Sequence, residues 1–154
     1  MLKRSSLLSK LKHRLRPRLK GSGQMEVFAL VGKAGTGKSF RARLVADTHA
    51  IPAIIDDGLL IHEGKIIAGR SAKEKEHYIA AVKTAMFNDP QHREEMIRAL
   101  TEAQFPKILL LGTSDRMILR NCLTLGIPEP AKIIRIEEIA SKEKIEEAIR
   151  QRKT

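Results

Sequence analysis

The sequence predicts an α/β domain in which a parallel sheet of about four to five strands is covered by helices on both faces. Four short apolar runs are separated by segments whose apolar residues have helical spacing. The runs are apolar at consecutive positions, which is typical of parallel strands buried on both faces. A chain of 154 residues with 42% hydrophobic residues is long enough for one such domain with its own core.

The four apolar runs define the predicted strands. They are EVFALV at 26–31, IPAIIDD at 51–57, KILLLG at 107–112 and KIIRI at 132–136. A further segment, LLIHEGKIIAG at 59–69, holds two short apolar runs about a Glu63–Gly64 turn. This pattern predicts either a hairpin or a long ordered loop.

Helices are predicted between and after the strands. The first spans Ser39 to Ala50, with Phe40, Leu44 and Val45 roughly on one face. The others are marked by apolar residues at helical spacing, namely Tyr78, Ile79, Val82, Ala85 and Met86; Met96, Ile97 and Leu100; Met117 to Leu123; and Ile145 with Ile149.

Composition excludes several classes of protein. Cys122 is the single cysteine, so an intramolecular disulfide and a four-thiolate zinc site are excluded, and we expect it to lie in the core. The five histidines do not share metal-ligand spacing. No apolar run approaches the roughly 20 residues that span a membrane. Aromatic residues are too scarce for a stacking platform for single-stranded nucleic acid. A reducing compartment and a cytoplasmic location are therefore expected.

The net charge of +11 is concentrated in a tail. Residues 1–20 hold eight Lys or Arg and no acid, whereas the remaining residues hold 21 basic and 18 acidic side chains. We divide the chain into a basic flexible tail, 1–22, and a folded domain, 23–154. The tail is interpreted as a solvated extension, as an arm that binds an anionic surface of lipid or nucleic acid, or as an organelle-targeting leader.

One motif carries the chemistry. Residues 32–39, GKAGTGKS, fit the pattern G-x-x-x-x-G-K-[ST] between a predicted strand and a predicted helix, and we call them the glycine motif. Glycines let successive backbone N–H groups approach phosphate oxygens, and the following helix adds the positive end of its dipole. Lys38 is expected to reach the β- and γ-phosphates, and Ser39 to ligate Mg²⁺.

The glycine motif resembles the P-loop of the P-loop NTPase superfamily (the Walker A motif), and the resemblance covers residues 26–150. Its extra glycine makes it similar to the loops of AAA-type ATPases and of small P-loop kinases. The resemblance implies that ATP and Mg²⁺ are bound, with Lys38 also in a catalytic role. The residues implied to contact the nucleotide are Gly32, Lys33, Ala34, Gly35, Thr36, Gly37, Lys38, Ser39 and Phe40.

Two acids follow the second predicted strand. A carboxylate of Asp56 can hold Mg²⁺ through its water shell, because Mg²⁺ keeps several waters and few protein ligands. In the ATPases that the chain resembles, the next residue is often a Glu that orients the attacking water, and Asp57 stands in that place with a shorter side chain. The alternative is that Asp56 and Asp57 only end the strand before Gly58.

The strand at 107–112 continues into Thr113, Ser114 and Asp115. By the same resemblance, one of these residues contacts the γ-phosphate; the alternative is that Ser114 or Asp115 caps the next helix. Candidate phosphate-binding arginines are Arg70, Arg116 and Arg120. The guanine-reading N-K-x-D motif is absent, and no helical lid domain follows the fourth strand.

The expected function is a Mg²⁺-dependent ATPase in which hydrolysis switches the hairpin 59–67 and the helices in 72–103, with a protein partner reading the change. Two alternatives stay open. The first is a small-substrate kinase in which Asp57 or Arg70 positions an acceptor hydroxyl. The second is a non-catalytic nucleotide-binding module that the basic tail tethers to membrane or nucleic acid.

Overall fold

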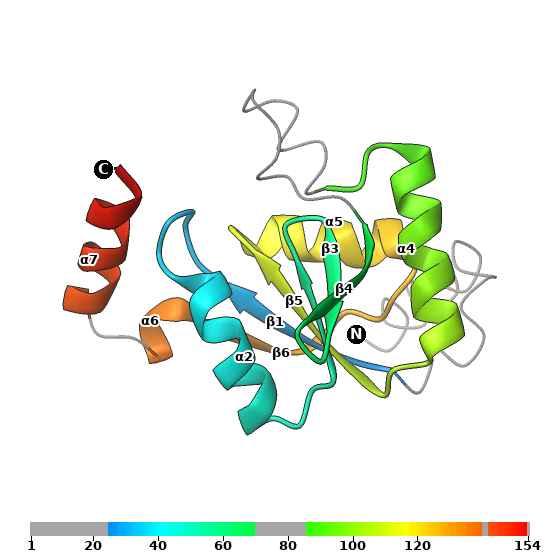
Figure 1. Cartoon of the computed structure of the whole chain (residues 1–154), viewed down its shortest axis with the longest axis horizontal. Helices are drawn as coiled ribbons and strands as arrows, with labels where there is room; N and C mark the ends of the chain where they lie inside the picture. The colour runs from blue at the N-terminus through cyan, green and yellow to red at the C-terminus, as the bar shows by residue number, and fades with distance from the viewer. Residues whose placement is uncertain (1–24, 70–85, 140–141, 154) are drawn as a thin grey trace, which may run out of the picture.

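A computed structural model describes residues 25–69, 86–139 and 142–153, which form one six-stranded sheet with helices around it (Figure 1). The strands are β1 (Glu26–Val31), β2 (Ala53–Asp56), β3 (Leu59–His62), β4 (Lys65–Gly69), β5 (Lys107–Gly112) and β6 (Pro130–Arg135). The helices are α2 (Lys38–Thr48), α4 (Pro90–Ala103), α5 (Asp115–Leu125), α6 (Ile136–Ile139) and α7 (Lys142–Lys153). The basic tail and the helix expected from Tyr78 lie outside the described residues.

The prediction of a purely parallel sheet of four to five strands is wrong. The order is β4-β3-β2-β5-β1-β6, and β3 runs antiparallel to both of its neighbours, whereas the β2–β5, β5–β1 and β1–β6 pairs are parallel. The reason lies in two short turns, Asp57–Gly58 and Glu63–Gly64, whose four residues all have positive φ. Such two-residue turns join antiparallel strands only. The hairpin reading of 59–69 is confirmed, and it extends the sheet at one edge.

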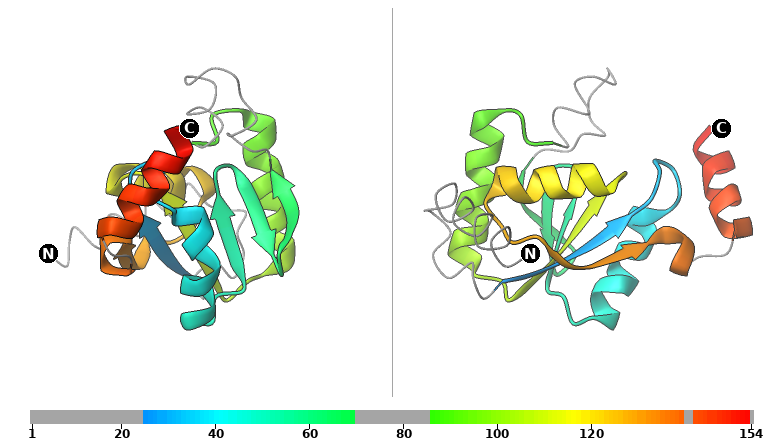
Figure 2. Two further views of the ribbon diagram at one scale, coloured as in Figure 1. Left: turned by 60° about the vertical axis from the view of Figure 1, so that its left-hand side comes forward. Right: turned by 180° about the vertical axis from the view of Figure 1, so that it is seen from behind.

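Each face of the sheet has its own apolar cluster. Along β1, Val27, Ala29 and Val31 belong to one cluster, and Phe28 and Leu30 to the other, because successive side chains of a strand alternate between faces. The first cluster packs under α4 and α5, and the second under α2. Figure 2 shows α2 and α4 on opposite sides of the sheet. The expectation of helices on both faces therefore agrees with the structure.

Helix α2 packs on the sheet through a different stripe from the one predicted. Phe40 and Leu44 are 84% and 67% exposed, whereas Ala42, Val45 and Ala46 are buried. The small side chains of the two alanines let the helix backbone approach the sheet closely, and this close approach fixes the start of α2 beside the carboxyl end of β1. Among the helices of the described ranges, none is long and apolar enough to cross a bilayer.

A buried histidine fastens α4 to the turn between β2 and β3. The Nε2–H of His92 donates to the carbonyl oxygen of Gly58 at 2.8 Å, and the His92 ring lies 4.9 Å from that of Phe87. Gly69, at the end of β4, packs so closely against the Gly58 carbonyl that a Cβ would collide with it. The Asp57–Gly58 turn is therefore held from α4 and from β4.

Replacing His92 by leucine is expected to lower the free energy of unfolding by about 1 to 3 kcal/mol, because the buried Gly58 carbonyl would lose its partner. Chemical denaturation followed by circular dichroism measures this difference. The matched control is His62→Leu: His62 Nδ1 also bonds a carbonyl, that of Pro52, at 2.7 Å, but its side chain is 33% exposed and water can replace it. If the two variants lower the free energy of unfolding by the same amount, the His92–Gly58 hydrogen bond does not have the proposed stabilising role.

Candidate functional site

The parallel strands bring their carboxyl ends to one edge of the sheet, and the chemistry-bearing residues gather there. A cavity of about 340 Å³ opens at this edge between the glycine motif, the acids Asp56 and Asp57 at the end of β2, and the end of β5. Open α/β sheets bind ligands at this edge. The C-terminal helix α7 also lines the cavity, through Ala148, Gln151 and Arg152.

The loop of the glycine motif is held by its own polar groups. Thr36, which is buried, donates from its hydroxyl to the Lys33 carbonyl at 2.6 Å. Lys38 Nζ donates to the carbonyls of Lys33, at 3.0 Å, and of Gly32. Gly35 and Gly37 have φ values of 78° and 88°, which side chains rarely adopt. These internal hydrogen bonds and the two positive φ values define the conformation of the loop.

The start of α2 opens into the same cavity. Gly37 is the N-cap residue, and because it has no side chain, the helix begins without a side-chain cap. A helix of this length also carries a positive partial charge at its N-terminus. Together with the ammonium of Lys38 and the loop N–H groups, this end of α2 makes a set of donors that fits phosphate oxygens.

Asp56 and Ser39 line the cavity together. Along β2, Ile55 belongs to the cluster under α4 and α5, and Ile54 to the cluster under α2. Alternation therefore places Asp56 on the α2 side, the side of Ser39. One carboxylate and one hydroxyl fit a Mg²⁺ ion that keeps most of its waters. Within the described ranges, no group of three or more His, Cys, Asp and Glu that suits a metal is found.

Asp57 lines the same cavity from within a tight turn. Its φ of 56°, followed by 90° at Gly58, is the conformation of a two-residue hairpin turn in which Asp-Gly is a favoured pair. The interpretation that the acids end the strand is therefore correct for the backbone. It does not compete with a chemical role, because the turn holds the Asp57 side chain at the cavity.

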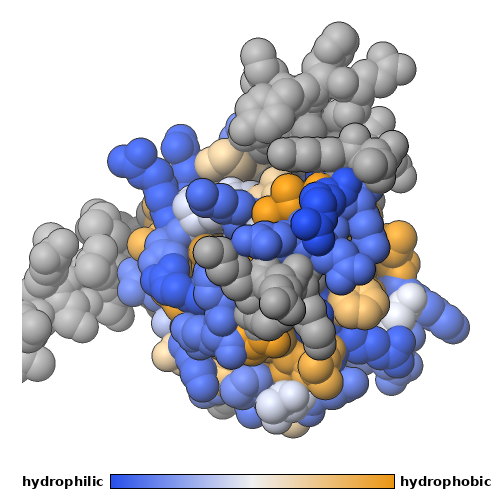
Figure 3. All heavy atoms as spheres, turned by 90° about the vertical axis from the view of Figure 1, so that its left-hand side faces the viewer, coloured by the Kyte–Doolittle hydropathy of each residue, from blue (hydrophilic) through white to orange (hydrophobic). Residues whose placement is uncertain are grey.

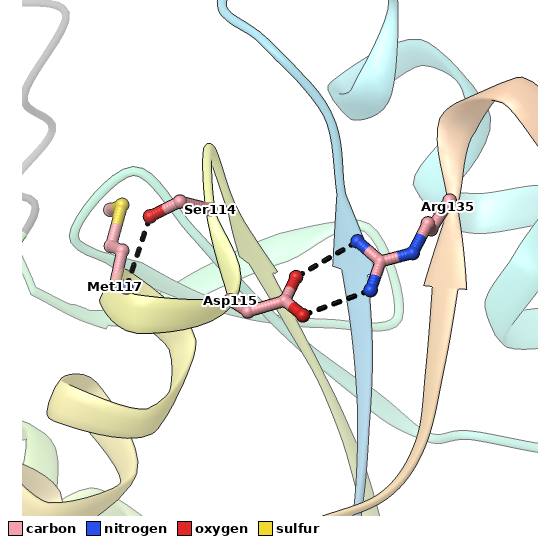
Figure 4. A network of polar contacts seen from close by, with 4 residues as sticks. All are labelled: Ser114, Asp115, Met117 and Arg135. Atoms are coloured by element: carbon pink, nitrogen blue, oxygen red, sulfur yellow. Dashed lines mark hydrogen bonds and ion pairs between the residues drawn. The ribbon is translucent and has the colours of Figure 1, made fainter.

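The structure separates the three residues after β5. Thr113 lines the cavity. Ser114 is the N-cap of α5, and its hydroxyl accepts a hydrogen bond from the Met117 N–H at 3.2 Å. Asp115 forms two hydrogen bonds of 2.9 Å with the Arg135 guanidinium (Figure 4). The Thr113 hydroxyl donates to the Met117 sulfur at 3.4 Å, and Thr113 is the residue of the three that lines the cavity.

The Asp115–Arg135 pair crosses the end of β1. Val31, the last residue of β1, is in register with Gly112 on one side and Arg135 on the other, so the pair connects the start of α5 to the end of β6 across β1. The hydrogen bonds from Arg135 lower the pKa of the Asp115 carboxyl, and those to Asp115 raise the pKa of Arg135. The pair therefore adds stability above the pKa of an unfolded aspartate and loses it as pH falls through the lowered value.

Two of the three candidate arginines do not line the cavity, and the third is not described. Arg116 and Arg120 are exposed on α5 and do not line the cavity, and Arg70 lies outside the described residues. Arg152, near the end of α7, lines it instead, as does Gln151. The sequence gives one weak signal for this, the helical spacing of Ile145, Ala148 and Arg152. Phe40 lines the cavity but is mainly exposed, and Cys122 is buried as expected.

The chain matches no protein-family model, and no curated protein or solved structure is detectably similar to it.

Replacing Ser114 by alanine is expected to lower the free energy of unfolding by about 1 kcal/mol, because α5 loses its N-cap hydrogen bond. The measurement is denaturant unfolding of the variant beside Thr113→Ala, the neighbouring residue, which does not cap the helix. If Thr113→Ala costs as much stability as Ser114→Ala, the division of roles between these two residues is wrong.

Proposed function

We propose that the chain binds ATP and Mg²⁺ at this edge of the sheet and hydrolyses the triphosphate, using the cycle to switch the conformation of a surface that a partner protein reads. The observation that carries the proposal is the loop of the glycine motif. Its glycines, Lys38 and the start of α2, which has no side-chain cap, line one cavity that Asp56 and Asp57 also line.

Each residue has a role that follows from its place. Residues 32–37 and the α2 N-terminus would hold phosphate oxygens through backbone N–H groups, with Lys38 exchanging its loop carbonyls for phosphate. Ser39 and Asp56 would hold Mg²⁺, which neutralises phosphate charge when bound. Asp57 would orient the attacking water, and Thr113 would contact the outer phosphate.

The switch is supported by what holds Asp57 in place. Its turn is bonded to buried His92 of α4 and packed against Gly69 of β4. A change at the two acids therefore has a direct path, through packed and hydrogen-bonded groups, to the β3–β4 hairpin and to α4. The basic tail, which lies outside the described residues, remains a predicted arm for anionic lipid or nucleic acid.

The deciding experiment is phosphate release from ATP in the presence and absence of Mg²⁺, with and without small acceptors. Mg²⁺-dependent release of inorganic phosphate without any acceptor supports the ATPase. Transfer that requires an acceptor would favour the kinase reading instead. Tight ATP binding with neither reaction would favour a non-catalytic module.

Lys38→Ala is expected to weaken ATP binding by about 1.5 to 3 kcal/mol, or roughly 10- to 150-fold, because a charge-assisted hydrogen bond to phosphate is lost. Isothermal titration calorimetry with Mg·ATP measures the change. The control is Lys65→Ala, which removes the same charge at the start of β4. Lys65 pairs with His62, at the end of the β3–β4 hairpin that lies away from the Asp57–Gly58 turn. An unchanged affinity in Lys38→Ala would overturn the phosphate site.

Changing each of the two acids to asparagine is expected to have a different effect on binding and hydrolysis. Asp56→Asn should lose the Mg²⁺ dependence of ATP binding, whereas Asp57→Asn should bind Mg·ATP normally and hydrolyse it slowly. Asn is favoured in this type of turn, so Asp57→Asn tests the carboxylate without straining the backbone. Glu63→Gln, in the other positive-φ turn, is the control for hydrolysis. Wild-type turnover in both aspartate variants would mean that the two acids only end the strand and form the turn.

A further inference from the structure

We propose that Arg152, on the C-terminal helix α7, is a phosphate-binding residue of the same site, so that α7 senses the bound nucleotide. The inference rests on the proposed function and adds a residue from an element more than a hundred positions away in the chain. Arg152 lines the cavity together with Lys38, Asp56 and Asp57.

Helix α7 is seated against the glycine motif along one stripe. Ile145 packs on the apolar cluster under α2. One turn further along, the Ala148 Cβ lies 3.9 Å from the position that a Cβ on Gly37 would take, and a turn later Arg152 lies against Gly35. The outer side carries the exposed Glu146, Glu147 and Arg150, and Figure 3 shows that this side of the molecule is mainly hydrophilic.

The contact with Gly35 places the aliphatic part of Arg152. A Cβ on Gly35 would come within 2.9 Å of the Arg152 Cδ, so the space left by the missing side chain is the space that the arginine stem fills. A packed stem leaves the guanidinium as the mobile end of the side chain. Arg152 is exposed and lines the cavity, so its guanidinium can reach a ligand bound there. Gly35 therefore has two structural roles. It adopts the φ of 78° that the loop requires, and its missing side chain leaves space for the stem of Arg152.

Charge supplies the second argument. Among the described residues, the charged side chains that line the cavity are Lys38, Arg152, Asp56 and Asp57, two cations and two acids. Without Arg152, the acids would outnumber the cations at a site proposed for a polyanion. A planar guanidinium with five donors binds phosphate oxygens in pairs, which a single ammonium does not do. Arg152 thus offsets the second acid and adds directional hydrogen bonds.

The test compares Arg152→Ala with Arg150→Ala, which removes the same charge from the exposed side of the same helix. Titration calorimetry of each full-length variant uses Mg·ATP and inorganic tripolyphosphate as separate probes. Arg152→Ala should weaken both probes by roughly 10- to 100-fold, and Arg150→Ala by less than about twofold. Arg152→Lys should recover part of the loss, because it keeps the charge and loses the paired donors.

Three results would overturn the inference. Equal affinities for Arg152→Ala and Arg150→Ala would make Arg152 an ordinary surface residue. Tighter binding by Arg152→Ala would mean that α7 obstructs the site. A loss for ATP with none for tripolyphosphate would place the contact at the base or sugar. Failure of the wild-type chain to bind either probe would instead sink the proposed function, and the inference with it.

Discussion

The structure of the site depends on the closure of the glycine motif on itself. Lys38 reaches back from the first turn of α2 to the carbonyls of Gly32 and Lys33, and Thr36 donates to the same Lys33 carbonyl. These bonds hold the loop in a conformation that its left-handed glycines permit. The first residues of α2 consequently line the cavity beside the loop.

The position of the acids depends on a second constraint, the contacts that hold the Asp57–Gly58 turn. The turn reverses the chain into β3, and the Gly58 carbonyl is held by His92 and packed against Gly69. The same turn thus determines both the antiparallel direction of β3 and the position of the carboxylates. In the proposed cycle, this turn is what connects the nucleotide to the hairpin and α4, because Asp57 cannot move without moving a turn that both elements contact.

The sequence predicted what is local and missed what is distant. β1 and β5 were predicted at their observed bounds, and the hairpin about Glu63–Gly64 followed from its turn residues. The sequence pattern does not predict the Asp57–Gly58 turn, because apolar residues followed by acids also fit a parallel strand that ends at a ligand. The docking of Arg152 on Gly35 could not be predicted, since no periodicity within α7 specifies which distant surface it meets. Phe40 and Leu44 were misplaced because alanine packing outweighed their hydrophobicity.

The central claim is that the backbone of the glycine motif binds the phosphates of a nucleotide, and amide hydrogen exchange tests it directly. The full-length chain is compared with and without saturating Mg·ATP, residue by residue. The account predicts slower exchange at the amides of residues 32–39, which would become hydrogen-bonded to phosphate. Unchanged exchange across these residues, with protection appearing only elsewhere in the chain, would contradict it.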